Sequence, residues 1–268
     1  METCLTLTSV SWRHKIRDFS TWKPWAKKDG PGIHSIDLKI QKGSILGLIG
    51  PNGAGKTTLM RAICGLYDCE GFDKSCASRR IGIGYMPEQI RWEGRMSVRS
   101  ALQTISLMRD KDIDLDSIIQ TVGLSSKSEH YLDDLSQGMR QRLSLACALV
   151  GEPRILVMDE PLNGLDPLAQ RAFCNLLKDL ASKGVAIVIS SHQVSDLESF
   201  VDRIALLHHG QLLAEGTLPS IRQNLGLKDG DGIVEMICSV TGIDPEDVSL
   251  ELSNDDLLPF KQHVGEEE

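Results

Sequence analysis

A glycine-rich loop that ends in lysine and threonine is the strongest chemical signal in this sequence. It fits the pattern G-x-x-x-x-G-K-[S/T] at every position, and it consists of Gly50, Pro51, Asn52, Gly53, Ala54, Gly55, Lys56 and Thr57, with Thr58 next in the chain. Glycines let backbone N–H groups wrap a phosphate, and a helix after the loop would point its positive end at the same anion. Lys56 would bring a positive charge to the terminal phosphates of a triphosphate, and the Thr57 hydroxyl would ligate Mg²⁺. A glycine-rich turn with an incidental lysine is the plainer alternative, but the apolar run before the loop and the helical pattern after it favour a phosphate site.

Two adjacent acids form a second chemical signal. Asp159 and Glu160 directly follow the apolar run 155–158. Carboxylates in such a place are costly to desolvate unless they meet a metal ion, a donor or a substrate, and ligands bind at the ends of parallel strands. Taken alone, the pair suits a solvated strand end. Beside a phosphate loop, we expect Asp159 to ligate magnesium and Glu160 to act as base for an attacking water.

Alternating strand and helix patterns must position these groups. Short apolar or alternating runs predict strands at 4–12, 36–40, 44–49, 80–85, 155–158 and 185–190, and a hairpin at 204–207 and 211–215. Helical spacing predicts helices at 56–64, 98–108, 115–122, 137–150 and 168–180. Residues 13–31 are rich in Lys, Trp and Pro, which predicts a loop or an irregular insertion. Buried strands that alternate with helices predict an α/β fold with a mostly parallel sheet covered on both faces.

The composition limits the classes of function. The chain has 268 residues, 41% of them hydrophobic, and it has no apolar run of the roughly 18–20 residues that a bilayer-spanning helix needs. Its seven cysteines are scattered and include no C-x-x-C pair, which favours a reducing, cytoplasmic compartment over a zinc site or disulfides. The net charge of −8 disfavours duplex DNA as the main partner, because Lys and Arg supply most of that affinity. We therefore expect no nucleic-acid partner.

Four further motifs, in a fixed order, resemble those of the ABC ATPase family. Residues 135–142 (LSQGMRQR) resemble the signature motif of that family, and they precede the Asp159 strand as the family requires. Residues 163–166 (NGLD) resemble the D-loop, and His192 resembles the switch histidine. Residues 85–89 (YMPEQ) occupy the Q-loop position. The ordered set covers residues 4–220, and the amino acids in its motifs are similar to those of the branch that powers ABC-2-type exporters.

The resemblance implies a fold, an activity and a set of site residues. The fold would be a P-loop NTPase with a RecA-like, mostly parallel core, an antiparallel β part and an inserted helical lobe. The activity would be ATP hydrolysis with Mg²⁺, in which Lys56, Glu160 and His192 act on the γ-phosphate and the attacking water. Ser136, Gly138 and Asp166 would face the nucleotide held by a second subunit, because two such chains close head to tail around two ATP molecules.

The sequence departs from the family pattern in two motifs. In the signature, Gln137 stands where the first of two paired glycines is common, and Met139 stands where a glutamine is common. Ser136 and Gly138, which would touch phosphate, are kept, so we expect function to survive. In the Q-loop, Glu88 occupies the usual glutamine position and Gln89 comes one residue later. Either residue could act at the Q-loop. The Glu88 carboxylate could reach Mg²⁺ but would only accept hydrogen bonds, whereas the Gln89 amide could both accept and donate them.

The segment around residue 13 bears on two further questions. Family members place an aromatic residue near this register to stack on adenine, and here Trp12 and His14 are the candidates. The basic insertion at 13–30 also carries Trp22 and Trp25, a composition favoured at membrane interfaces. It would lie near lipid headgroups or grip a membrane partner, or it would be a solvated loop whose tryptophans pack locally.

We therefore expect an ABC ATPase domain over residues 1–226, with a helical lobe at about 90–150, and an acidic, partly disordered extension over 227–268. The expected protein is the ATP-hydrolysing subunit of a transporter, most simply an exporter. Its partners would be ATP, a second ABC ATPase subunit in a homo- or heterodimer, and integral membrane permease subunits. It would lie in the cytoplasm, on the inner face of the membrane through the permease. The alternatives are a non-transport ABC ATPase that acts on nucleic acid or ribosomes, and a regulatory module that closes on ATP without turnover; Glu160 argues against the latter.

Overall fold

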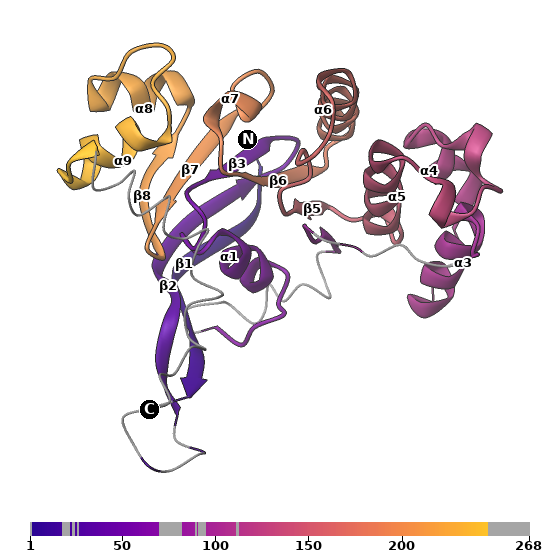
Figure 1. Cartoon of the computed structure of the whole chain (residues 1–268), viewed down its shortest axis with the longest axis horizontal. Helices are drawn as coiled ribbons and strands as arrows, with labels where there is room; N and C mark the ends of the chain where they lie inside the picture. The colour runs from indigo at the N-terminus through magenta and orange to yellow at the C-terminus, as the bar shows by residue number, and fades with distance from the viewer. Residues whose placement is uncertain are drawn as a thin grey trace, which may run out of the picture.

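Two sheets make up the β structure of the chain (Figure 1). The computed structural model describes residues 2–17, 22, 25, 27–69, 82–88, 90, 95–110 and 113–245. The strands are β1 (Thr3–Arg17), β2 (Lys27–Gln41), β3 (Ile45–Ile49), β4 (Ile83–Met86), β5 (Ile155–Met158), β6 (Ala186–Ser191), β7 (Arg203–His208) and β8 (Gln211–Gly216). β1 and β2 form an antiparallel pair. The other six form one sheet in the order β4-β5-β6-β3-β7-β8, parallel except for the last pair.

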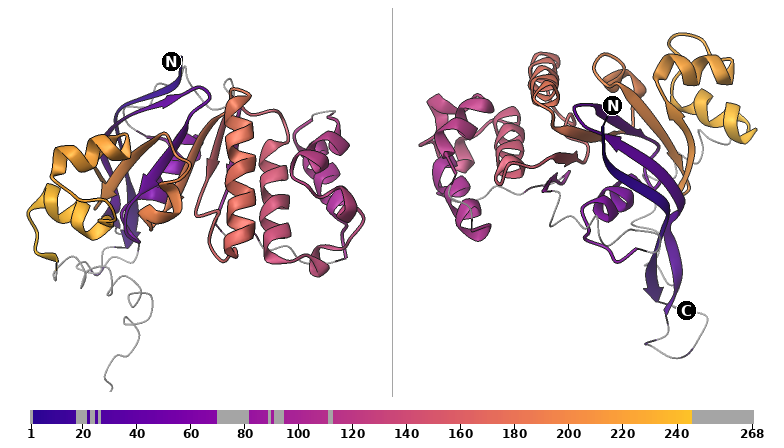
Figure 2. Two further views of the ribbon diagram at one scale, coloured as in Figure 1. Left: turned by 90° about the horizontal axis from the view of Figure 1, so that it is seen from above. Right: turned by 180° about the vertical axis from the view of Figure 1, so that it is seen from behind.

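Helices cover the six-stranded sheet and extend beyond its β4 edge (Figure 2). They are α1 (Lys56–Ile63), α3 (Val98–Met108), α4 (Leu115–Thr121), α5 (Gln137–Leu149), α6 (Pro167–Ser182), α7 (Val194–Leu197), α8 (Leu218–Leu225) and α9 (Ile233–Thr241), with short 3₁₀ turns at Ser125–Lys127 and Leu132–Asp134. In the part of the chain that the structure describes, none of these helices has the length and apolarity to span a bilayer. The predicted α/β class with a mostly parallel sheet and an antiparallel part is confirmed.

The core lies on both faces of the six-stranded sheet. Alternate residues of a strand point to opposite faces, and in β3 Leu46 and Leu48 pack toward α1 and the β1–β2 pair. Ile45 and Ile49 of the same strand pack toward the face that α5 and α6 cover. Both faces are therefore apolar, which is why the parallel strands read as continuous hydrophobic runs in the sequence.

The predicted helical lobe is present at one end of the molecule. α3, α4 and α5 pack against one another beyond the β4 edge of the sheet. Each helix begins at a residue whose side chain accepts a hydrogen bond from the first turn, namely Ser97, Asp114 and Ser136. These caps satisfy backbone donors that have no partner inside the helix, so the helix boundaries predicted for the lobe hold to within a residue.

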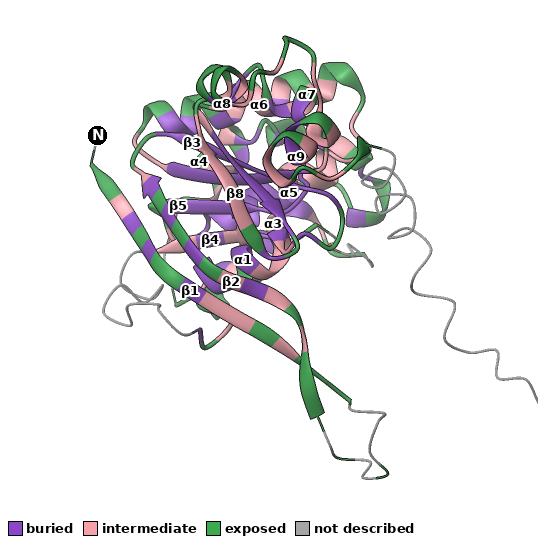
Figure 3. Cartoon of the chain, turned by 90° about the vertical axis from the view of Figure 1, so that its left-hand side faces the viewer, coloured by how far each residue is buried: buried purple, intermediate pink, exposed green. Residues whose placement is uncertain are grey.

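The prediction of a loop at 13–31 is wrong for the residues that the structure describes there. β1 and β2 continue to pair as far as Arg17 opposite Lys27, with irregular register on the way. The far end of the hairpin leaves the body of the protein (Figure 3), and no described residue of β1 after Trp12 or of β2 before Pro31 is buried, so these side chains show no apolar alternation. Main-chain pairing and an ion pair between Lys15 and Asp29 hold this end of the hairpin together.

The packing also continues past residue 226, where we expected the main domain to end. Gly226 ends α8 in the left-handed conformation, and α9 then packs on α8 and β8. Met236 and Ile237 of α9 are fully buried and belong to the same hydrophobic cluster as the parallel sheet. Residues 246–268, on which the prediction of a disordered acidic end falls, lie outside the described residues.

Candidate functional site

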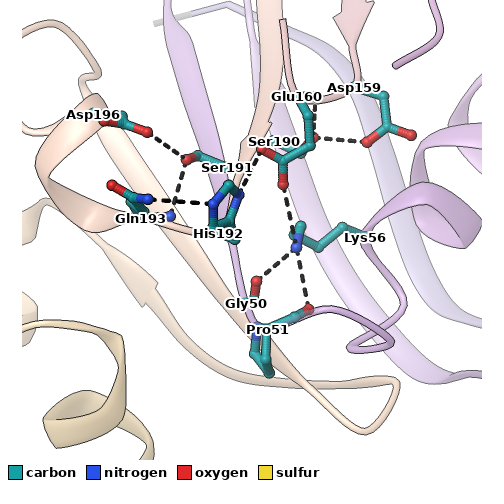
Figure 4. Close-up of polar contacts among 10 residues, drawn as sticks. All are labelled: Gly50, Pro51, Lys56, Asp159, Glu160, Ser190, Ser191, His192, Gln193 and Asp196. Carbon is teal, nitrogen blue, oxygen red and sulfur yellow. Dashed lines mark hydrogen bonds and ion pairs between the residues drawn. The ribbon is translucent and has the colours of Figure 1, made fainter. Parts of the chain in front are cut away.

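The residues predicted to carry chemistry meet at the carboxyl ends of the parallel strands. β4, β5, β6 and β3 are consecutive neighbours, and Met86, Met158 and Ile189 lie at matching levels near their carboxyl ends. Each strand is followed by one predicted group: Glu88, the pair Asp159–Glu160, His192 and the glycine-rich loop respectively. The topology therefore gathers residues that are more than a hundred positions apart in the chain (Figure 4).

These residues surround a cavity of about 350 Å³. It is lined by His14, Pro31, Gly32, Pro51, Asn52, Gly53, Ala54, Gly55, Lys56, Thr57, Thr58, Glu88, Asp159, Glu160, Asn163 and His192. The lining includes most of the residues predicted for nucleotide, magnesium and catalysis. Gly50 lies at the base of the loop, and Gln89 lies outside the described residues.

Glycine is required at both ends of the loop. A Cβ atom on Gly50 would lie 2.4 Å from the carbonyl oxygen of Leu207, which real contacts do not permit. Gly55 has a φ of 101° and precedes the first turn of α1, where no side chain caps the helix. The N–H groups of that first turn have no acceptor within the helix, and Lys56, Thr57 and Thr58 line the cavity. The loop is thus built to present backbone donors to an anion.

Lys56 is held inside this loop by main-chain carbonyls. Its ammonium group donates to the carbonyl oxygens of Gly50 at 2.6 Å and Pro51 at 3.1 Å. It also lies 3.5 Å from Oε1 of Glu160. Burial lowers the pKa of Lys56, while the charges of Glu160 and Asp159 act in the opposite direction. The lysine is therefore a buried cation aimed between the loop and the carboxylate pair.

The hydroxyl group of Ser190 fixes the two carboxylates. It accepts a hydrogen bond from the backbone N–H of Glu160 at 2.7 Å and donates one to Oδ1 of Asp159 at 2.8 Å. All three residues are buried. Glu160 has a φ of 45°, an uncommon conformation for a residue with a side chain. The turn after β5 thus holds Glu160 in a left-handed conformation and sends its side chain toward Lys56.

His192 completes a row of polar groups across the cavity. Its Nδ1 lies 3.1 Å from Oε2 of Glu160, and its Nε2 lies 3.3 Å from the side-chain amide of Gln193. Oε1 of Glu160 faces the other way, 3.5 Å from the ammonium group of Lys56. Lys56, Glu160 and His192 therefore lie in sequence, with Oε1 of the carboxylate toward the lysine and Oε2 toward the histidine.

The oxygen atoms of the cavity fit magnesium. Thr57, Glu88 and Asp159 line it with a hydroxyl and two carboxylates, which are the hard ligands that Mg²⁺ prefers. Within the described residues no group of three His, Cys, Asp or Glu side chains is arranged to hold a metal by itself, and Mg²⁺ ordinarily takes its remaining ligands from water and phosphate. Burial and the charges of Asp159 and Glu160 raise the pKa of Glu88, so a cation here would relieve repulsion among three acids.

The signature residues form a separate pocket on the same chain. Ser136, Gln137, Gly138, Gly164 and Asp166 line a hollow of about 390 Å³ that shares no residue with the first cavity. Two of them also have structural roles, because Ser136 caps α5 and the carboxylate of Asp166 caps α6. The side-chain amide of Gln137 donates to the carbonyl oxygen of Asn163 at 3.2 Å, and it therefore links this pocket to a residue of the first cavity.

The two candidates for the adenine ring lie in different environments. His14 lines the cavity, whereas Trp12 does not. Trp12 stacks on Tyr67 with ring centroids 3.8 Å apart and meets His14 edge-on at 4.3 Å. Trp12 therefore packs against His14 and does not itself line the cavity.

Several lining or supporting residues were not predicted from the sequence. Asn163 sits in the D-loop motif, so its neighbours could have indicated it. Pro31 ends the segment predicted as a loop and Gly32 follows it, and nothing in the sequence brings them to the phosphate loop. Ser190 could have been suspected because it ends a buried strand next to the Asp159 strand, where a lone hydroxyl needs a partner.

Comparisons with known proteins agree with this geometry. A family model described as "ABC transporter" matches residues 33–163. The chain is 35% identical over 196 residues to the "Probable multidrug ABC transporter ATP-binding protein YbhF" of Escherichia coli (strain K12), a match that covers 68% of this chain and 34% of that protein. It is 32% identical over 200 residues to the "Nod factor export ATP-binding protein I" of Rhizobium sp. (strain N33), covering 69% of this chain and 66% of that protein. The chain thus spans one third to two thirds of the length of these relatives.

Solved structures share the fold. The "Structure of ATP binding subunit of ABC transporter" superimposes with a TM-score of 0.66 at 23% identity, covering 92% of this chain and 98% of that one. A second structure, an ATP-binding cassette of an ABC transporter in its ADP conformation, gives a TM-score of 0.65 at 20% identity, covering 87% and 98%. At these identities the similarity shows the fold of the chain. The match covers nearly all of each solved structure.

Proposed function

Because this chain belongs to the ABC transporter family of ATP-binding proteins, we propose that it binds ATP with Mg²⁺ in the cavity around Lys56 and hydrolyses it. The free energy of ATP hydrolysis would drive the movement of a substrate through a separate membrane permease. The single observation that carries this proposal is the arrangement of Lys56, Glu160 and His192 around one cavity, above a loop built to bind an anion. Binding alone would not require a buried carboxylate held between two such groups.

The residues of the cavity divide the tasks of binding. Backbone N–H groups of the glycine-rich loop and of the first turn of α1 would bind the β- and γ-phosphates, and Lys56 would exchange its contacts with the loop carbonyls for contacts with phosphate oxygens. Thr57, Asp159 and one of Glu88 and Gln89 would hold the magnesium ion. When bound, Mg²⁺ neutralises the charge that develops on the phosphates. His14, supported by the stacked rings of Trp12 and Tyr67, would lie against the base.

Glu160 and His192 would manage the attacking water. Oε1 of Glu160 lies 3.5 Å from the ammonium group of Lys56, and it would take the proton of the attacking water once Lys56 contacts phosphate. The contact of Oε2 with His192 keeps the carboxylate in place, and His192 would also stabilise charge on the γ-phosphate. Positioning and electrostatics of this kind account for most of the rate in phosphoryl transfer.

The signature pocket would complete the site of a second subunit. Ser136 and Gly138 stand at the first turn of α5, a turn with anion-binding donors of its own, and they line a pocket apart from the cavity of their own chain. Two chains arranged head to tail would bring the pocket of each against the nucleotide of the other. Closure on ATP and reopening after hydrolysis would then move the permease partner, and the name of the Nod factor relative favours export.

Measurement of ATP turnover tests the catalytic claim. We expect Glu160→Gln to keep Mg·ATP binding and to lose about 100-fold or more in turnover, the range for removal of a positioned base. Lys56→Ala should lose binding itself. Lys42→Ala is the matched control, since Lys42 is an exposed lysine that pairs with Glu2 away from the cavity, and it should behave as wild type. Equal turnover in wild type and Glu160→Gln would overturn the enzyme assignment.

Purification from membranes tests the role in transport. The protein should be recovered from detergent-solubilised membranes of its source together with a multi-span membrane protein. Recovery with ribosomes or nucleic acid in its place would support the non-transport alternative and would contradict a permease partner.

A further inference from the structure

The far end of the β1–β2 hairpin projects from the body of the protein. We call this region the hairpin tip and define it by residues 13–17 and 27–29 together with Trp22 and Trp25. Figure 3 shows the two strands running past the buried part of the molecule, with exposed residues toward their end. Trp22 is 86% exposed, Trp25 is 69% exposed and Ile16 is 40% exposed. Large apolar side chains are thus presented to solvent at the part of the hairpin farthest from the core.

The tip is also positively charged in a negatively charged protein. Its described residues carry five cations, which are Arg13, Lys15, Arg17, Lys27 and Lys28, and one carboxylate, Asp29. Asp29 pairs with Lys15, and the carboxylate has its pKa lowered by that hydrogen bond. The whole chain carries a net charge of −8, so the tip is a local concentration of positive charge.

Stability of the fold does not account for this composition. The inward residues of the hairpin nearer the body, including Leu7, Val10 and Ile33, are buried against α1 and the parallel sheet. Among the described residues beyond Trp12 in β1 and before Pro31 in β2, none is buried. Ordering these residues costs conformational entropy and buries little apolar surface in return. Exposed tryptophans with clustered cations therefore indicate a partner.

We propose that the hairpin tip binds the surface of a bilayer that contains anionic phospholipids. Trp side chains prefer the headgroup level of a membrane, where the ring is in an apolar environment and its N–H stays hydrated. Lys and Arg near the surface are attracted by anionic lipid. The exposed tryptophans and lysines project from the body of the protein and suit a surface of lipid, because lipid does not require complementary shape. Apart from His14, the residues of the tip do not line the ATP cavity, so the proposal stands separately from ATP hydrolysis.

Flotation with lipid vesicles tests this proposal directly. We expect the purified chain to float with phosphatidylcholine vesicles that contain phosphatidylglycerol, and to float much less with phosphatidylcholine alone. Trp22→Ala/Trp25→Ala and, separately, Lys27→Gln/Lys28→Gln should each reduce the fraction bound about tenfold, and added salt should weaken binding because it screens exposed charges. The control Leu107→Ala/Met108→Ala removes an equally exposed apolar pair from α3, at 75% and 81% exposure, and should bind like wild type.

ATP turnover without vesicles should be unchanged in both tip variants, because neither alters a residue that lines the cavity. This measurement shows that the variants are folded. The absence of binding to anionic vesicles in the wild-type chain would overturn the proposal, as would equal binding by the tip variants and the control. Loss of permease recovery in the tryptophan variant, without any lipid binding in wild type, would assign the tip to the permease instead.

Discussion

One hydroxyl group in the site has a role that can be separated from its neighbours. Ser190 holds the backbone of Glu160 and the side chain of Asp159 at once, so it orients the proposed base and the proposed metal ligand relative to each other. Ser191, the next residue, is equally buried but bonds to Asp196 and to the backbone of Gln193. Two adjacent serines thus differ in what they position.

We expect Ser190→Ala to lower kcat about 10- to 100-fold, because small displacements of catalytic groups have effects of this size. The KM for ATP should change little, since Ser190 does not line the cavity, but more Mg²⁺ should be needed for half-maximal turnover. Ser191→Ala is the matched control and should keep the Mg²⁺ requirement of wild type. An equal loss of kcat in both variants, with no change in Mg²⁺ dependence, would reduce Ser190 to a packing role.

At the scale of elements, the strands that can be predicted from the sequence are those whose burial leaves a clear pattern of apolar residues. β3, β5 and β6 have nearly continuous apolar residues because both faces of each strand are covered, and the site residues follow directly from the ends of these strands. The outer part of the β1–β2 hairpin could not be predicted in this way. There β1 pairs with β2 through the main chain, and polar residues such as Lys15 and Asp29 oppose each other. No apolar pattern marks these strands.

The same limit applies to the site. The phosphate loop and the acids after β5 are contiguous motifs, and each was found from neighbouring residues alone. Gly32 and His14 reach the cavity because β1 and β2 pass beside the loop after β7, where the backbone of His34 donates to the carbonyl oxygen of Gly210. No local pattern records such a contact. Likewise no local pattern distinguishes His14, which lines the cavity, from Trp12, which does not.

Helix α9 supplies a prediction at this scale. Met236 is fully buried among residues of the parallel sheet cluster, so Met236→Ala should reduce the free energy of unfolding by about 2–5 kcal/mol. Ser239 lies on the exposed side of the same helix, and Ser239→Ala should change that free energy by less than about 0.5 kcal/mol. Urea unfolding measures both. A Met236→Ala variant as stable as wild type would show that the residues after 226 form a dispensable appendage.

At the scale of the whole molecule, the proposed dimer would use two separate pockets of each chain, the cavity around Lys56 and the signature pocket. The cavity and the signature pocket share no lining residue. Gly138 is the sharpest probe of the second half, because a Cβ atom there would meet Ala169 and Leu165 at ordinary distances of 3.7 and 3.8 Å. A substitution at Gly138 therefore has room in the isolated chain, and an effect on turnover would arise from what approaches from outside.

Complementation between two inactive variants tests the head-to-tail arrangement. Lys56→Ala damages the cavity half, and Gly138→Asp places a carboxylate where a partner's phosphates would come. Each variant alone should be inactive, since every composite site of its dimer contains the damaged half. In an equal mixture, half of the dimers pair the two variants and one of their two sites is intact, so turnover should return to about a quarter of the wild-type rate if the sites act independently. Mixing either variant with itself is the control. If the mixture stayed inactive while Gly138→Asp still bound Mg·ATP, the signature residues would not act on the nucleotide of a second subunit, and Ser136 and Gly138 would need another explanation.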